Sequence, residues 1–85
     1  MGKRYHIKDD VWIESQGRAG EFSVEVAGDR VADLYFFRQI IKHGVSTTSR
    51  LTYLATGERV EGFACYFKDV KKYLRWQDWN SKVAA

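Results

Sequence analysis

Basic and aromatic side chains gather in the second half of the chain, and these residue types bind nucleic acids. Lysine and arginine pair with phosphates, and aromatic rings stack on bases. The candidate binding residues are five cations and two aromatic residues, Arg50, Arg59, Phe63, Lys68, Lys72, Arg75 and Trp79. Residues 38–85 carry nine Lys/Arg against four Asp/Glu, whereas residues 1–37 carry five against seven. This asymmetry predicts a polyanion-binding surface in the C-terminal half.

Side chains suited to metal binding or catalysis are present, but their spacing favours neither. His6, His43 and Cys65 lie far apart in the sequence, without paired ligand spacing. Asp9 and Asp10 are adjacent, so on a strand they would point apart and could not form an acid–base pair across a substrate. No Ser or Cys has an identifiable base and orienting acid, and the glycines form no phosphate-binding loop. We therefore expect a protein that is not an enzyme and has no metal or cofactor.

The clearest local pattern lies in residues 51–70, where a turn signal around Gly57 separates two runs of β-branched and aromatic residues. We expect a β-hairpin whose alternating side chains form two faces. The expected core face is mostly small and apolar and consists of Leu51, Tyr53, Ala55, Val60, Gly62, Ala64 and Tyr66. The expected open face mixes charged and aromatic residues and consists of Thr52, Leu54, Thr56, Arg59, Glu61, Phe63, Cys65 and Phe67.

The N-terminal third has the composition of short strands. Residues 5–8 and 11–14 should form a hairpin or one bent strand, because the turn residues Asp9 and Asp10 lie between them. Residues 15–20 contain two glycines and should form a loop, and residues 21–27 alternate as a half-buried strand does.

Residues 29–43 support two interpretations. As a helix, which we favour, the segment begins at Asp29 as N-cap and ends before Gly44. Its apolar flank would contain Leu34, Phe37, Ile40 and Ile41. In this interpretation, residues 45–50 are a polar connection.

The alternative places a hairpin turn at Gly28 and Asp29 and a strand over residues 30–37. It is supported by an internal similarity between FSVEVAGDRVAD and LTYLATGERVEG, which aligns Gly28 with Gly57 at an offset of 29 residues. Two hairpins would then have the same construction. Chance or shared hairpin chemistry can also produce such a match, so it does not establish a repeat.

The pattern becomes helical from Phe67 onward. One face contains Phe67, Val70, Tyr73, Leu74 and Gln77. The opposite face presents Lys72, Arg75 and Trp79, with Trp76 beside them. The two indoles could form a stacking or partner-binding patch, or they could cap the core.

The segment EGFACYFKDV, residues 61–70, resembles the RNP1 strand of the RNA recognition motif. Gly62, Phe63 and Ala64 match its glycine, aromatic and small positions. The resemblance implies RNA binding on a sheet face, and a helix at residues 29–43 would give a similar element order without the final strand. The sequence departs from RNP1 at Glu61, where the motif is basic, and at Cys65, where it has a stacking aromatic residue.

Length and composition indicate one α+β domain covering residues 1–85, with loose termini at 1–3 and 82–85. We expect an antiparallel sheet of about four or five strands with one or two helices packed on one face. No apolar run suggests a secretion signal or a membrane span, and the single cysteine suits a reducing compartment, so we expect a cytoplasmic protein without a membrane partner.

The expected function is a small non-catalytic module that binds nucleic acid, DNA or RNA, through its basic C-terminal half. The alternative is a protein–protein interaction protein, such as a small regulator or inhibitor, that uses exposed aromatic residues and could act as a homodimer. Added salt should separate the two, because phosphate contacts weaken steeply with salt and aromatic contacts do not.

Overall fold

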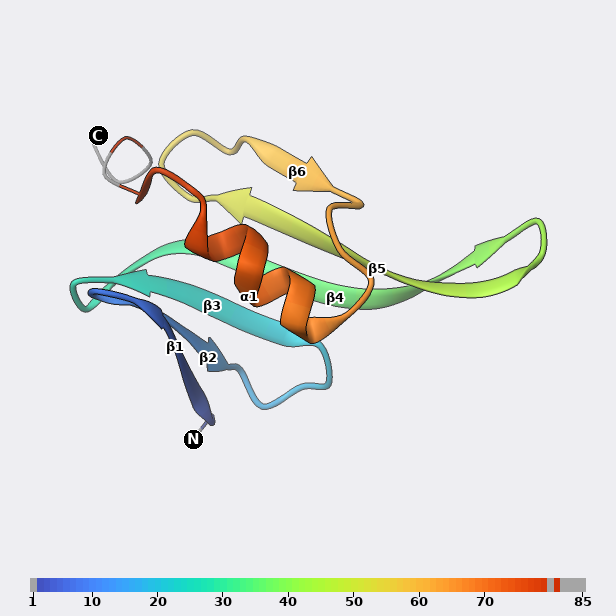
Figure 1. The fold of residues 1–85 in the computed structure, drawn as a ribbon, viewed down its shortest axis with the longest axis horizontal. Coiled ribbons are helices and arrows are strands. Elements are labelled where there is room, and N and C mark those ends of the chain that lie inside the picture. The colour runs from blue at the N-terminus through green and yellow to red at the C-terminus, as the bar shows by residue number, and fades with distance from the viewer. Residues whose placement is uncertain (1, 80, 82–85) are drawn as a thin grey trace.

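Six strands form one antiparallel sheet in which each strand pairs with the next along the chain (Figure 1). In order, the elements are β1 (Arg4–Lys8), β2 (Val11–Ser15), β3 (Glu21–Val26), β4 (Asp29–Ile41), β5 (Gly44–Tyr53), β6 (Arg59–Glu61) and α1 (Phe67–Arg75). This computed structural model describes residues 2–79 and 81. The α+β class is confirmed, but the sheet has six strands instead of four or five, and the helix α1 accompanies it.

The N-terminal strands form the expected hairpin, in which Lys8 pairs with Val11 and Asp9 adopts a positive φ of 41°. The loop and the third strand also lie where the sequence predicted them, since β2 ends at Ser15 and β3 begins at Glu21. Near the N-terminus, the Lys3 carbonyl oxygen accepts a hydrogen bond from the Ser15 amide (2.9 Å). The expectation of loose ends at Met1 and residues 82–85 lies outside the described residues.

The helix expected over residues 29–43 is wrong, and the hairpin alternative holds, with its turn one residue earlier than expected and its strand longer, at residues 29–41. Ala27 and Gly28 both have positive φ, 53° and 87°, as the two central residues of a type I′ turn require. The strand that follows is paired on both sides, so its side chains alternate between the two faces of the sheet. Ala32 and Leu34 are buried on one face. Apolar spacing alone could not separate the two interpretations, because the pairing partners are distant in sequence.

The connection expected at residues 45–50 is also wrong, because these residues belong to β5. The hairpin near Gly57 is present, and its register places Leu51 opposite Val60 and Arg50 opposite Glu61. Its second strand is short and ends at Glu61. The two hairpins are therefore not alike, since the β3–β4 turn has two residues and the β5–β6 connection spans residues 54–58.

The element order does not follow the RNA recognition motif, because a strand occupies the position of the motif's first helix. The RNP1-like segment is also not a continuous strand. After Glu61 the chain bends and approaches β5, where the buried Ser49 hydroxyl donates to the Ala64 carbonyl oxygen (2.9 Å) and accepts from the Ala64 amide (3.1 Å). This pair of bonds, the Ser49–Ala64 clamp, fixes the approach to α1.

The helix α1 begins at Phe67 as expected and lies across one face of the sheet (Figure 1). The Phe67 ring lies 5.0 Å from that of Tyr5 and 5.5 Å from that of Phe22, while Val70 and Leu74 are fully buried. We call the face beneath α1 the covered face and the opposite one the outer face. The main buried residues are Ile7, Val11, Ile13, Val24, Ala32, Leu34, Leu51, Tyr53, Val70, Leu74 and Trp79. Over the described ranges, no helix has the length and apolar character needed to cross a membrane.

The strands β4 and β5 continue beyond the rest of the sheet as a two-stranded projection (Figure 1). β3 pairs with β4 only as far as Tyr35, and β6 pairs with β5 only as far as Arg50. Phe36 pairs with Ser49 next, and five further cross-strand pairs follow, from Phe37 with Thr48 to Ile41 with Gly44. We call residues 37–48 the arm and the remaining sheet with α1 the body. The arm makes the molecule elongated, with extents of 40 × 26 × 19 Å.

Candidate nucleic-acid interface

The exposed face of α1 carries three of the candidate cations. Lys68, Lys72 and Arg75 are separated by four and three residues, a spacing that places side chains on one helical face. All three are exposed, and none forms an ion pair with a residue that the structure describes. The buried residues Val70 and Leu74 fix this orientation, because they hold the opposite side of the helix on the sheet.

The two candidate arginines of the hairpin project from the outer face, away from the helix. Arg50 Nε donates to Glu61 Oε2 (2.5 Å), and the guanidinium lies 5.0 Å from the Phe37 ring centroid. Arg59 is exposed opposite Thr52. The sheet therefore separates these arginines from the α1 cations, so the candidate residues do not form one continuous site.

Phe63 was expected on an open sheet face, and this prediction is wrong. It is half-buried, and its ring stacks on that of Tyr73 with centroids 4.3 Å apart. The chain bends after Glu61, so the strict alternation on which the facial assignment rested ends there. Phe67, also assigned to the open face, packs against the core.

The two C-terminal indoles have different environments. Trp79 is only 3% exposed, its Nε1 donates to the Leu74 carbonyl oxygen (2.7 Å), and its ring lies 6.0 Å from that of Tyr53. Trp76, at the C-cap of α1, is 77% exposed. Trp79 thus caps the core and offers no free ring face in this structure, whereas Trp76 stands beside Arg75. Helical spacing placed Trp76 near the cations, but only the tertiary fold shows which indole is buried.

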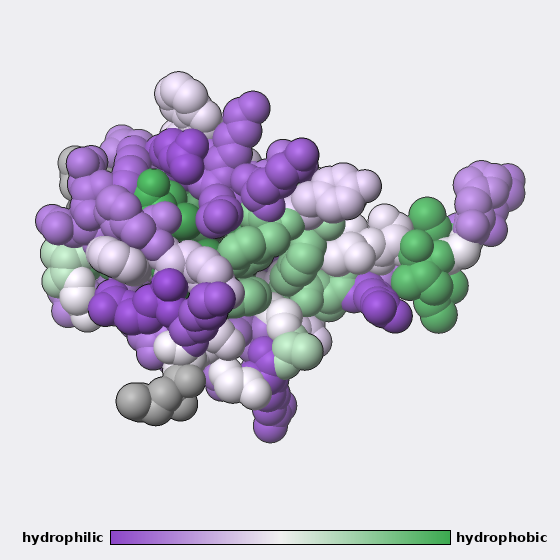
Figure 2. Space-filling view, turned by 60° about the horizontal axis from the view of Figure 1, so that its bottom comes forward, coloured by the Kyte–Doolittle hydropathy of each residue, from purple (hydrophilic) through white to green (hydrophobic). Residues whose placement is uncertain are grey.

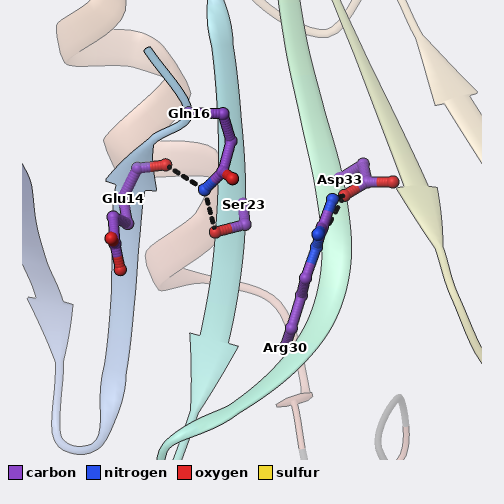
Figure 3. A network of polar contacts seen from close by, with 5 residues as sticks. All are labelled: Glu14, Gln16, Ser23, Arg30 and Asp33. Carbon is purple, nitrogen blue, oxygen red and sulfur yellow. Dashed lines mark hydrogen bonds and ion pairs between the residues drawn. The ribbon is translucent and has the colours of Figure 1, made fainter. Parts of the chain in front are cut away.

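The outer face of the body carries a network of polar contacts (Figure 3). The Arg30 guanidinium bonds Asp33 Oδ1, and Gln16 Nε2 donates to Ser23 Oγ (2.8 Å) and to the Glu14 carbonyl oxygen (3.2 Å). A hollow beside this network is lined by Gln16, Glu21, Phe22, Arg30, Asp33, Leu34 and Tyr35. Because its arginine and its aspartate already bond each other, this hollow presents little uncompensated charge.

A second pair of charges lies on the same face, where Arg4 Nη2 is 3.4 Å from Glu25 Oε1. The hydrogen bond with Glu14, followed by burial, raises the pKa of the Glu25 carboxyl, and the Arg4 charge opposes that rise. Two neighbouring carboxylates repel a phosphate chain. This part of the outer face is therefore a poor surface for nucleic acid.

The arm adds two cations that were not among the candidates. Arg38 and Lys42 are exposed on it, with His43 beside Lys42 at the turn, and residues 34–57 contain no Asp or Glu. Their positions were visible in the sequence, but the expected helix hid the fact that they share a projecting ribbon. Within the described ranges, no group of three or more His, Cys, Asp or Glu side chains could hold a metal ion, and Cys65 is an exposed free thiol.

No family model, curated protein or solved structure matches this chain. Fold-level analogy is therefore absent, and a function must be argued from the arrangement of its side chains.

Proposed function

We propose that this protein is a non-catalytic module that binds nucleic acid through the exposed face of α1. The observation that carries the proposal is the row of Lys68, Lys72 and Arg75, which is exposed and unpaired among the described residues. Cations at this spacing can follow a phosphate backbone, and their counterion release supplies binding free energy that does not depend on sequence.

The distribution of ion pairs supports this choice of surface. Three arginines of the outer face, Arg4, Arg30 and Arg50, are each within ion-pair distance of a carboxylate. A phosphate would have to compete with those carboxylates, whereas it can approach the α1 cations directly. Arg50 and Arg59 then belong to a separate, weaker surface.

Trp76 supplies the aromatic ring on which bases can stack at this surface. Its indole is exposed beside Arg75, and an aromatic ring next to a cation is the usual combination in sequence-tolerant binding of single strands. Phe63 and Trp79 act as supports, because the first packs on Tyr73 and the second on the end of α1. The exposed thiol of Cys65 suits a reducing compartment, so we propose the cytoplasm as the location.

Tryptophan fluorescence titrations with a short single-stranded oligonucleotide at several salt concentrations test the proposal. Three phosphate contacts predict a slope of log K against log salt of about −2. The double variant Lys72→Glu/Arg75→Glu should reduce the magnitude of that slope by about 1.4, because two contacts are lost. The variant Trp76→Phe should remove most of the quenching and retain binding measured by oligonucleotide anisotropy.

The matched control is Arg38→Glu/Lys42→Glu, which changes the net charge equally but lies on the arm, away from α1. If this control weakens binding as much as the helix variant does, the interaction follows net charge and α1 is not the site. Absence of binding by the wild-type protein at low salt would refute the proposal itself.

A protein partner is the second candidate, because two large aromatic residues at the ends of α1 are exposed. Tyr66 is 66% exposed and Trp76 is 77% exposed. Exposed aromatic residues are common anchors of protein interfaces. Binding that Trp76→Ala abolishes, that Lys72→Glu/Arg75→Glu preserves and that salt hardly changes would favour this candidate.

A further inference from the structure

The end of the arm exposes an apolar pair that no described residue covers. Ile40 and Val45 lie opposite each other on β4 and β5, and they are 88% and 65% exposed. Figure 2 shows the arm projecting from the body, with hydrophobic side chains near its end and a hydrophilic tip. Counting by twos from Leu34 and Leu51, the pair continues the covered face of the sheet.

Two cations, Arg38 and Lys42, flank this apolar pair. Arg38 precedes Ile40 by two residues on the same face of the ribbon, and Lys42 forms the turn beyond it together with His43. All three are exposed, and no ion pair joins them to any residue in the described ranges. The stretch from 34 to 57 lacks acidic residues, so nothing on the arm repels a polyanion.

The dimensions of the arm suit a groove of duplex DNA. Two paired strands lie about 4.8 Å apart, and the major groove, about 12 Å wide, admits a two-stranded ribbon. From Phe37 to Ile41 the ribbon extends by four residue steps, about 13 Å, which exceeds the groove depth of about 8.5 Å. Hydroxyl groups of Ser46, Thr47 and Thr48 along the returning strand can bond phosphate oxygens.

We infer that the arm enters the major groove of duplex DNA, with Arg38 and Lys42 on the phosphates and Ile40 and Val45 against the thymine methyl groups. This inference rests on the proposed function and adds to it the nucleic acid that is bound. The thymine methyl is the apolar group of the major groove, so it suits an exposed Ile–Val pair. Duplex RNA is disfavoured, because its deep, narrow major groove excludes side chains and its uracil lacks the methyl group.

The test measures binding of a short A·T-rich DNA duplex and of the same duplex with uracil in place of thymine. The wild-type protein should bind the thymine duplex several-fold more tightly. The variant Ile40→Ser/Val45→Ser should lose about tenfold in affinity for the thymine duplex, within the range for a base contact, and should bind both duplexes equally. Arg38→Gln/Lys42→Gln should reduce the magnitude of the duplex salt slope by about 1.8.

The matched control is Ile41→Ser, which removes an isoleucine from the opposite face of the same ribbon and should retain the preference for thymine. Because the substituted side chains are exposed, circular dichroism and the melting temperature should match those of the wild-type protein. Single-strand binding through α1 should be unchanged in every arm variant, and this measurement separates the arm from the proposed function.

Three outcomes would overturn the inference. If the wild-type protein binds single strands but the arm variants bind duplex as it does, the arm is not in contact with DNA and only the inference fails. If neither strand form binds, the proposed function fails and the inference falls with it. If Ile40→Ser/Val45→Ser instead converts a dimer to a monomer, or abolishes binding to anionic vesicles, without changing DNA binding, the arm engages a second copy or a membrane surface.

Discussion

The body and the arm share two strands, β4 and β5, yet the two regions differ in what covers these strands. Leu34 and Leu51 form an apolar cross-strand pair in the body, and Ile40 and Val45 form one in the arm, on the same face of the same ribbon. The first pair is at most 2% exposed because α1 and the rest of the core pack over it, whereas nothing described packs over the second. Identical pairing therefore produces a core in one region and an exposed apolar surface in the other.

Strand pairing and burial are separate sources of order in this protein. A two-stranded hairpin alone is marginally stable in water, so the arm depends on the body to hold its root. The body, in contrast, gains from removing apolar surface from water. Residues that stabilise the fold should therefore lie in the body. Residues of the arm have little stabilising role, so we expect them to serve binding.

The largest effect is expected from shortening one β4 side chain in each region to alanine, Leu34 in the body and Ile40 in the arm. Leu34→Ala should lower the free energy of unfolding by about 2–5 kcal/mol, because it removes buried methylene groups and leaves a cavity. Ile40→Ala should change it by less than about 0.5 kcal/mol, because the side chain is already in water. Urea denaturation of both variants compares them directly, and equal losses would contradict the division into body and arm.

A smaller effect is expected at the boundary between the two regions. Ser49→Ala removes the clamp on Ala64 and leaves a buried amide and carbonyl without their partner, so it should cost about 1–3 kcal/mol. Ser46→Ala makes the same chemical change inside the arm, where it should cost less than about 0.5 kcal/mol. Thermal and urea unfolding would measure both, and an Ser49→Ala protein as stable as the Ser46→Ala protein would show that the clamp contributes nothing.

The smallest effect is a pH dependence confined to the body. Burial, with the charges of Tyr73 and Glu58, raises the pKa of Tyr53 from 10.0 to about 12. Between these values the unfolded chain releases the phenolic proton and the folded protein retains it. The contribution of Tyr53 to the free energy of unfolding is therefore complete below pH 10 and is lost as the pH rises toward 12. The free energy of unfolding should fall more steeply over this range for the wild-type protein than for Tyr53→Phe. Parallel curves would contradict the raised pKa.

Much of the body was predictable because its signals are local. The Asp9–Asp10 turn, the alternation from Glu21 onward and the helical pattern from Phe67 each depend on neighbours in sequence, and each prediction agrees with the structure. The count of strands was wrong because two long segments were assigned to a helix and a loop.

The arm was not predictable from the same reasoning. Leu34, Phe37, Ile40 and Ile41 satisfy a helical period, and Asp29 and Gly44 resemble its caps. The polar run at residues 45–50 does not resemble a buried strand, and over residues 45–48, which belong to the arm, it need not, because both faces of a two-stranded ribbon can remain in water. Pairing between β4 and β5 and with β3 decides the conformation, and that pairing is not a local property.

The candidate site was predictable in part. The helical spacing of Lys68, Lys72 and Arg75 placed them together, and the structure brings them to one exposed face. The burial of Trp79 and the packing of Phe63 on Tyr73 depend on how the chain bends after β6 and after α1. No sequence period encodes those bends.

The root of the arm is held on both sides. On one side the Phe36 amide donates to the Gly20 carbonyl oxygen (2.7 Å), and a side chain at Gly20 would meet the Phe36 carbonyl oxygen at 2.1 Å. On the other side is the Ser49–Ala64 clamp. When a ribbon is fixed at its base and unsupported along its length, any bending displaces its tip the most. Thermal bending therefore enlarges the volume that Lys42 and Ile40 sweep, and a larger swept volume raises the rate of first encounter with a partner.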